Sequence, residues 1–319
     1  MNTFTSRNSR VIIREVWAYN LDSEFTILQN TVKYYSYVSL DTEYPGVIYH
    51  PVIYTNNHVT HLSPSQNYYL MKANVDATNV IQLGLTLSDE NGNLPHLGTD
   101  SCYVWQFNFK DFNVDKDLSN PASIELLKQQ GINFLKNKQQ GISGREFSRL
   151  FFYCFGPGRK FNNPTENLKI TWVTFHGHYD IAYLLAMIIQ TKLPYDLDTF
   201  IHLLHYYFGS SVYDLKMILK FQGLHGGLER MAEILEVDRL AGKHHQAGSD
   251  SLLTMRMFLK TKKSYFSGNN FDKLSHFTYM LFGLNLQIKN KIVAPYLFAP
   301  MIPSNQYYQY YTNQYYQFY

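Results

Sequence analysis

Cysteine, net charge and charged residues are all scarce in this chain of 319 residues. Its two cysteines, Cys102 and Cys154, lie far apart and form no CxxC motif, so the sequence indicates neither a zinc knuckle nor a disulfide framework. A reducing compartment is expected. The formal net charge is only +3, which is modest for a protein that holds nucleic acid through a broad basic surface.

Long apolar runs are also missing. Residues 1–10 are polar and lack the apolar core of a signal peptide, so secretion is not expected. The longest apolar stretches, 181–189 and 279–288, fall well short of the roughly 18 uninterrupted apolar residues of a membrane span. We therefore predict that both stretches are buried helices and that no membrane is a partner.

Strands and helices alternate along the sequence. Runs of β-branched and aromatic residues predict strands at 37–43, 80–87, 102–109 and 170–175, and a short strand or turn at 212–215. Helical spacing of apolar residues predicts helices at 21–33, 181–189, 197–207, 228–235 and 247–263, with three more within 121–155. Residues 80–87 and 102–109 form a hairpin across a turn that contains Asn91-Gly92-Asn93. The sequence therefore predicts an α/β fold, a mixed sheet flanked by helices.

The C-terminus differs in composition from the rest of the chain. Residues 305–319 are almost all Tyr, Gln and Asn, which is typical of a disordered, self-associating tail. We predict a single domain over residues 1–288 and a C-terminal extension over 289–319 that ends in this tail.

The first candidate site is the pair Asp41 and Glu43 at the end of a predicted strand. Side chains two apart on a strand project from the same face and can converge on one cation. Carboxylates are hard oxygen ligands and suit Mg²⁺ or Mn²⁺. A D-x-E pair is more often solvated surface, but this pair follows an apolar strand, which favours burial.

Two further acids, Asp180 and Asp250, each occupy the start of a predicted helix. Such junctions gather at one edge of an α/β sheet. Four acids that meet there repel one another unless cations neutralise them, which is the requirement of a two-metal phosphoryl-transfer site.

His245 lies five residues before Asp250 on the loop that leads into its helix. A histidine in that position can take a proton from an attacking water. A lone loop histidine is more often structural or solvated, so its neighbours must support this role.

The acidic motifs resemble those of the Caf/Pop deadenylases, which belong to the DEDD exonucleases. The resemblance covers about residues 11 to 288. It rests on 41–46 (DTEYPG), 171–177 (TWVTFHG) and 245–254 (HQAGSDSLLT), with further matches at 14–17 (REVW), 82–88 (QLGLTLS) and 105–109 (WQFNF). Two departures are Tyr44, where the family has phenylalanine, and His178, where the family has a small or apolar residue.

The resemblance implies a ribonuclease H-like fold and a poly(A)-specific 3′-to-5′ exoribonuclease that releases AMP. It implies that Asp41 bridges two cations, Mg²⁺ or Mn²⁺, and that Asp180 completes one of the two sites. Glu43 and Asp250 complete the other, and His245 is the general base. The implied partners are poly(A) RNA, a Not scaffold subunit and a second deadenylase of the Ccr-Not complex, in cytoplasm and nucleus.

Two other functions stay open for the same residues. The domain can be an adaptor of the Ccr-Not complex without catalysis, or a DEDD exonuclease directed at DNA. A serine hydrolase built from His245, Ser249 and Asp250 is disfavoured because the chain has no G-x-S-x-G elbow.

Two further clusters are interpreted as structural. His202 and His205 lie three apart on a predicted helix and are interpreted as ordinary helix positions rather than metal ligands. The basic stretch 260–263 is interpreted as a solvated helix end rather than an RNA contact.

Overall fold

The computed structural model describes residues 10–51, 62–157 and 169–284. Its strands are β1 (Val11–Val16), β2 (Tyr37–Glu43), β3 (Gln82–Ser88), β4 (Cys102–Asn108), β5 (Thr171–Thr174) and β6 (Val212–Asp214). Its helices are α1 (Leu21–Thr31), α2 (Pro64–Ala77), α3 (Pro121–Gln129), α4 (Phe134–Gln140), α5 (Gly144–Phe155), α6 (His178–Ile189), α7 (Leu197–Phe208), α8 (Leu215–Phe221), α9 (Leu228–Ile234) and α10 (Ala247–Tyr265). Two 3-10 helices, η1 (Ala18–Asn20) and η2 (Gly268–Phe277), complete the set.

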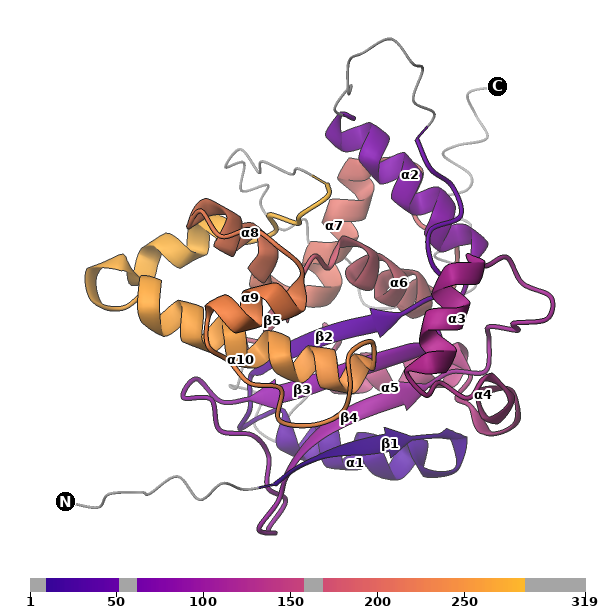
Figure 1. The fold of residues 1–319 in the computed structure, drawn as a ribbon, viewed down its shortest axis with the longest axis horizontal. Coiled ribbons are helices and arrows are strands. Elements are labelled where there is room, and N and C mark those ends of the chain that lie inside the picture. Colours follow the sequence, from indigo (N-terminus) through magenta and orange to yellow (C-terminus); the bar gives the residue numbers. More distant parts are fainter. Residues whose placement is uncertain (1–9, 52–61, 158–168, 285–319) are drawn as a thin grey trace. The chain divides into compact units, whose positions relative to one another are not determined.

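The strands form one mixed sheet in the order β1-β4-β3-β2-β5-β6 (Figure 1). Strand β3 runs antiparallel to both of its neighbours, β2 and β4. Strands β2, β5 and β6 are parallel to one another, so all three end at the same edge of the sheet. This carboxyl edge is where ligands bind in open α/β sheets.

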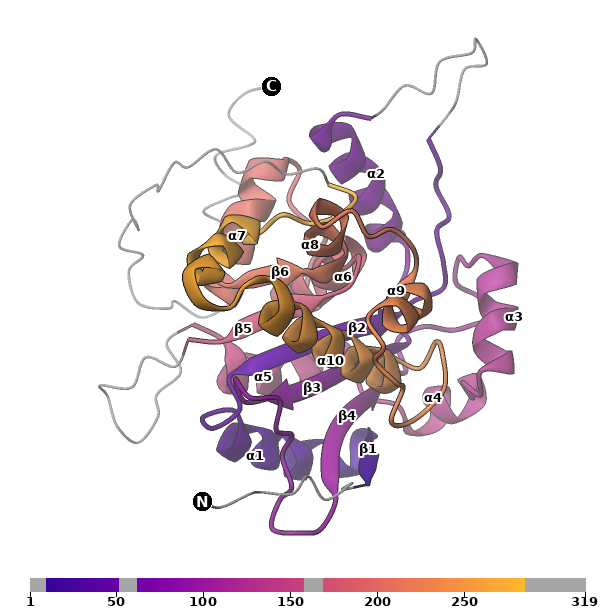
Figure 2. The same ribbon diagram turned by 60° about the vertical axis from the view of Figure 1, so that its left-hand side comes forward.

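Helices cover both faces of the sheet, and each layer has its own apolar core. The larger cluster joins the sheet to helices that include α1, α5, α6 and α7, and the smaller one joins it to α8, α9 and α10. Neighbouring residues of β5 show the alternation, because Trp172 packs into the larger cluster and Val173 into the smaller one. Figure 2 shows α10 crossing the sheet over β2 and β3.

Helix α10 lies unusually close to the sheet at Gly84. A Cβ atom at this position would be 1.9 Å from the carbonyl oxygen of Ala247, the first residue of α10. The strand residues facing α10 are small and polar: Ser39 Oγ donates to the Ser251 carbonyl at 2.7 Å, and Thr86 Oγ1 lies 3.0 Å from Ser251 Oγ. Gly84 pairs with Asp41 across the ladder, so the start of α10 lies beside the end of β2.

The structure confirms most elements predicted from the sequence. The mixed α/β sheet with flanking helices, the β3–β4 hairpin and the three helices within 121–155 are all present. The uncertain segment at 212–215 is a strand, β6. Helix α6 begins at His178, three residues before the predicted start, and therefore includes Asp180.

Three elements were not predicted: β1, α2 and the short helix α8, which follows β6 directly. Strand β1, at the edge of the sheet, has β-branched apolar residues at four of its six positions, so the sequence carried a strand signal that was missed. Helix α2 buries a polar side chain, Asn74, among its apolar positions. The Asn74 oxygen accepts from the backbone N–H groups of Ile48 and Tyr49 at 2.7 and 2.8 Å. A polar residue at this buried position interrupts the apolar period by which a helix is recognised in sequence.

The prediction of a buried helix at 279–288 is wrong for its described part. Residues 279–284 form turns, because Tyr279 and Gly283 adopt φ values of +59° and +100°, which no right-handed helix contains. Residues 285–288 lie outside the described residues, as do the tail at 305–319 and the whole extension 289–319. Across the part of the chain that is described, none of the helices combines the length and apolar character of a membrane span.

The close approach at Gly84 should make this glycine hard to replace. We expect Gly84→Ala to lower the free energy of unfolding by about 2 kcal/mol or more, because the new methyl group meets backbone rather than a movable side chain. Urea unfolding monitored by circular dichroism measures the change. The matched control is Gly227→Ala, where a Cβ meets no atom within 4 Å, and which should cost about 1 kcal/mol or less as a weaker helix cap. Equal losses in the two variants would contradict the proposed role of the contact.

Candidate active site at the carboxyl edge of the sheet

Strand β2 supplies two acids to the α10 side of the sheet. Asp41 and Glu43 are separated by one residue and so lie on the same face of the strand as Ser39, which bonds to α10. Glu43 is buried, with 8% of its surface exposed, and Asp41 is half-buried. The strand thus carries two carboxylates to the edge where β2, β5 and β6 end.

Asp180 reaches this edge from the first turn of α6. Its Oδ1 atom accepts two hydrogen bonds from Thr42, one from the backbone N–H at 2.8 Å and one from the hydroxyl at 2.5 Å. Thr42 lies between Asp41 and Glu43 in β2, so the same strand that carries two acids fixes the third. Gly177, which caps α6, permits this entry because a Cβ there would lie 2.2 Å from the Thr174 side chain.

Asp250 comes from the first turn of α10. The backbone N–H of His245 donates to its Oδ2 atom at 3.0 Å, and an Arg239 guanidinium nitrogen lies 2.6 Å from Oδ1. Arg239 also contacts Glu229 and Ser249, so it is tied to α9 and α10. His245 has a positive φ of 54°, which turns the chain sharply before the helix.

Glu43, His245 and Asp250 form the cluster of side chains best placed to hold an ion. Their ligand atoms all lie within 4.8 Å of one another. The two acids are buried and the imidazole is exposed, so His245 is the member of the group most open to solvent. Among the described residues no other group of three such side chains lies this close together.

The electrostatics of the cluster call for positive charge. Burial raises the pKa of Asp41 well above its ordinary value, and the negative charges of Asp180, Asp250 and Glu43 raise it further. Burial also raises the pKa of Glu43 strongly and that of Asp180 to about 7, although the Thr42 hydrogen bonds oppose the change at Asp180. Four oxygen-donor side chains that repel one another fit one or two hard divalent cations.

The histidine pair of α7 and the basic stretch 260–263 both have partners within the fold. His202 Nδ1 contacts the Asp198 carbonyl of its own helix, and the His205 ring lies on Tyr279 with 3.9 Å between centroids, so each has a structural environment. Lys262 Nζ lies 2.6 Å from the hydroxyl of Tyr37, so this part of the basic stretch is bound within the fold rather than solvated.

His178 is enclosed rather than directed at solvent. Burial, together with the neighbouring His176, lowers the pKa of its imidazole to about 3. Its ring lies 4.6 Å from Tyr179 and 5.2 Å from His176, measured between centroids.

Three residues near the site were not identified from the sequence: Thr42, Arg239 and Asp214. Asp214 ends β6 and is fully buried. Its carboxylate accepts four backbone N–H groups, from His176, Gly177, Lys216 and Phe282, at 2.8 to 3.1 Å. An acid at the end of a predicted strand is the signal that located Asp41, so Asp214 was within reach of the same reasoning.

Comparison with protein families and curated proteins identifies close relatives. The model of the CAF1 family ribonuclease matches residues 16–147. A probable CCR4-associated factor 1 homolog of Arabidopsis thaliana is 44% identical over 287 residues, which are 89% of this chain and 96% of the relative. A poly(A) ribonuclease, pop2 of Schizosaccharomyces pombe, is 40% identical over 258 residues, which are 81% of this chain and 71% of the relative.

Solved structures agree with these matches and with the predicted ribonuclease H-like fold. The S. pombe Pop2p structure with Mg²⁺ and Mn²⁺ bound is 38% identical, with a TM-score of 0.72 over 85% of this chain and 99% of that one. A yeast CAF1 structure, co-crystallised with the NOT1 MIF4G domain, is 31% identical, with a TM-score of 0.64 over 84% of this chain and 95% of that one.

Burial of an acid should make the metal-free protein sensitive to pH. The pKa of Asp180 is about 7 in the folded protein and about 4 in an unfolded chain, so the folded state holds a proton that the unfolded state releases. Stability without metal should therefore fall as pH rises from about 4 to about 7. We expect a lower melting temperature at about pH 8 than at about pH 5.5, and a larger gain from Mn²⁺ at about pH 8.

Asp180→Asn tests the cause of this pH dependence. The amide oxygen can still accept from Thr42, while the charge is gone, so the metal-free variant should melt a few degrees higher than the parent at about pH 8. Differential scanning calorimetry in chelator measures this. Asp115→Asn, at an exposed turn, is the control and should leave the melting temperature unchanged. A less stable Asp180→Asn protein at high pH would contradict the burial of this charge as the cause.

Proposed function

The chain belongs to the CAF1 ribonuclease family, and from this premise we propose that it is a 3′-to-5′ exoribonuclease that shortens messenger-RNA poly(A) tails. The observation that carries the proposal is the convergence of acids from β2, α6 and α10 on one edge of the sheet, with an exposed histidine beside them. This arrangement suits phosphodiester hydrolysis and release of AMP from the strand end.

In the proposed mechanism the acidic side chains hold two divalent cations, Mg²⁺ or Mn²⁺. Asp41, Glu43 and Asp250 would bind one ion, and Asp41 with Asp180 the other. The ions supply an activated water and stabilise charge on the leaving oxygen. Thr42 orients the Asp180 carboxylate through its two hydrogen bonds, and Arg239 restrains Asp250. Both acids are thereby held before substrate arrives, which limits the reorganisation that the reaction requires.

His245 is proposed as the general base. It is exposed, and its ring reaches the carboxylates of Glu43 and Asp250, so it can contact a water bound between them. The backbone N–H of His245 donates to Asp250, and this hydrogen bond connects the loop to the first turn of α10.

We further propose that the protein works in the messenger-RNA decay machinery, in cytoplasm and nucleus, bound to a Not scaffold and a second deadenylase. The yeast CAF1 relative co-crystallised with NOT1 supports the scaffold as a partner. An adaptor without catalysis is the second candidate, and a DNA-directed exonuclease the third. The purified chain separates them, since an adaptor releases no AMP and a DNA exonuclease prefers a DNA oligomer over the matched RNA.

Loss of one acid should abolish turnover without unfolding the protein. We expect wild type to shorten a 5′-labelled RNA with about twenty terminal adenosines in Mg²⁺ or Mn²⁺, and to stop in chelator. Asp41→Asn should reduce the rate by at least about 10³-fold, because in the proposed mechanism its carboxylate would help to hold both ions. Asp115→Asn is the charge-matched control and should cut normally. Near-normal cutting by folded Asp41→Asn protein would refute the assignment.

Adjacent histidines allow a sharper test of the base. We expect His245→Ala to lower kcat by about 10² to 10⁴-fold, the usual contribution of a general base. His244→Ala should change kcat little, because His244 contacts Glu229 at 2.9 Å and lies outside the acid cluster. Single-turnover rates over a pH series measure both. Similar losses in the two variants would point to the loop conformation rather than to proton transfer.

A further inference from the structure

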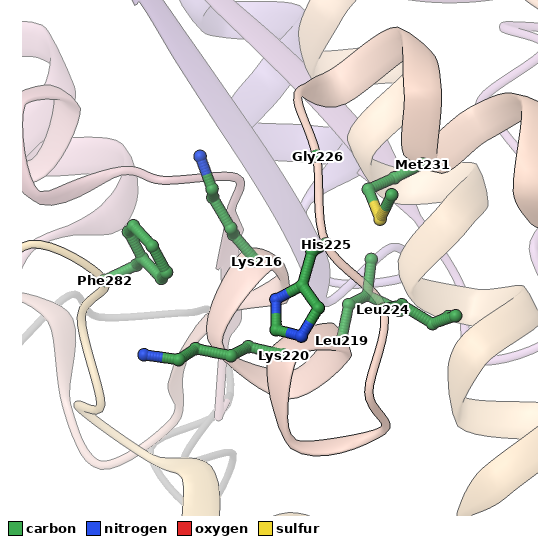
Figure 3. A pocket seen from close by; sticks show the side chains of 8 residues that line it. All are labelled: Lys216, Leu219, Lys220, Leu224, His225, Gly226, Met231 and Phe282. Carbon is green, nitrogen blue, oxygen red and sulfur yellow. The ribbon is translucent and has the colours of Figure 1, made fainter.

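A small pocket beside the acidic edge carries two lysines and an aromatic ring (Figure 3). Its volume is about 200 Å³. Lys216 and Lys220 come from α8, His225 precedes α9, and Phe282 follows η2. The mechanism above uses none of these residues.

The two ammonium groups approach the same ring. Lys216 Nζ lies 4.6 Å and Lys220 Nζ 5.5 Å from the centroid of Phe282. Within residues 10–51, 62–157 and 169–284 neither ammonium has a carboxylate oxygen within ion-pair distance. An ammonium group without a carboxylate partner can bind an anion such as a phosphate.

The pocket is fixed to the same edge of the sheet as the acids. Lys216 Nζ lies 3.3 Å from Nδ1 of His176, in the turn that leads from β5 to Asp180. The Asp214 carboxylate accepts the backbone N–H groups of His176, Lys216 and Phe282 together. The buried Asp214 carboxylate therefore fixes the turn before Asp180 relative to the two backbone segments that carry Lys216 and Phe282.

Its chemistry matches one nucleotide of a single strand. Ammonium groups neutralise a backbone phosphate, while an aromatic ring offers a surface on which a base can stack. Phe282 and the exposed His176 ring meet edge to face, with 4.8 Å between centroids. An acidic protein would need the charge alone and would leave the ring without a purpose, so the combination favours RNA.

We propose that Lys216 and Lys220, whose ammonium groups point apart around Phe282 in Figure 3, bind backbone phosphates of the RNA strand upstream of the scissile bond, with Phe282 beside an attached base. The inference rests on the proposed function, because it assumes that the strand end lies at the four acids. It assigns the pocket to substrate binding: a longer substrate gains a contact that the shortest one lacks.

Lys220 gives the cleaner test, since it is exposed while Lys216 contacts His176. We expect Lys220→Ala to raise KM for a twenty-adenosine RNA about fivefold or more. The slope of log(kcat/KM) against log salt concentration should become shallower by about 1, the effect of losing one phosphate contact. Hydrolysis of the dinucleotide ApA should be unchanged, because its only phosphate is the scissile one. Lys220→Arg should restore most of the affinity because it keeps the charge.

Lys33→Ala is the matched control. Lys33 also lies over an aromatic ring, 5.1 Å from the centroid of Tyr34, but it follows α1 in the other helix layer. It should leave KM for both substrates unchanged. An unchanged KM for the long RNA in Lys220→Ala would overturn the proposal and leave an acidic protein as the ligand to seek.

A binding measurement separates failure of the pocket from failure of the proposed function. If wild type degrades neither substrate, the exoribonuclease proposal fails. The pocket is then tested by fluorescence anisotropy of labelled twenty-adenosine RNA on the Asp41→Asn protein, with and without Lys220→Ala. A loss of affinity of about fivefold or more supports the pocket, and equal affinities refute it.

Discussion

The backbone contact between Gly84 and Ala247 is the constraint on which the acidic site depends. Because β3 presents no side chain at this point, the first turn of α10 can lie directly on the sheet. Gly84 is the ladder partner of Asp41, so the helix that carries Asp250 comes down beside the strand that carries Asp41 and Glu43. Without this approach, Asp250 would lie away from Asp41 and Glu43 on β2.

Gathering carboxylates in this way has an electrostatic cost that the protein offsets only in part. Burial raises the pKa values of Asp41, Glu43 and Asp180. Neighbouring acids raise them further, and for Asp180 that neighbour is Asp214, so each resists ionisation without added positive charge. Arg239 supplies one such charge, and it lies against Asp250. The negative charge that Arg239 does not neutralise favours cation binding, because a divalent ion at the cluster also removes the repulsion between the acids.

The sequence was informative where a local period decides the outcome and uninformative where a distant partner does. Alternation in residues 37–43 placed Asp41 and Glu43 on one face, and the strand-to-helix junction located Asp180. Neither pattern reveals that Thr42 holds Asp180, 138 residues away. Helix α2 was not predicted for a similar reason, since its buried Asn74 accepts hydrogen bonds from Ile48 and Tyr49, which lie 26 and 25 residues earlier in the chain.

Asp214 shows what separates a structural acid from a candidate ligand. It ends β6 as Asp41 and Glu43 end β2, on the same edge of the same sheet, and it is more deeply buried than either. Its carboxylate, however, accepts four backbone N–H groups. They lower its pKa and offset part of the effect of burial, which holds the pKa at about 6. Asp180 accepts hydrogen bonds from Thr42 on a single oxygen, Oδ1, and Asp41 lies among other acids. Position in the fold brings all of these acids to the edge, and the number of donors around each decides whether it needs a cation.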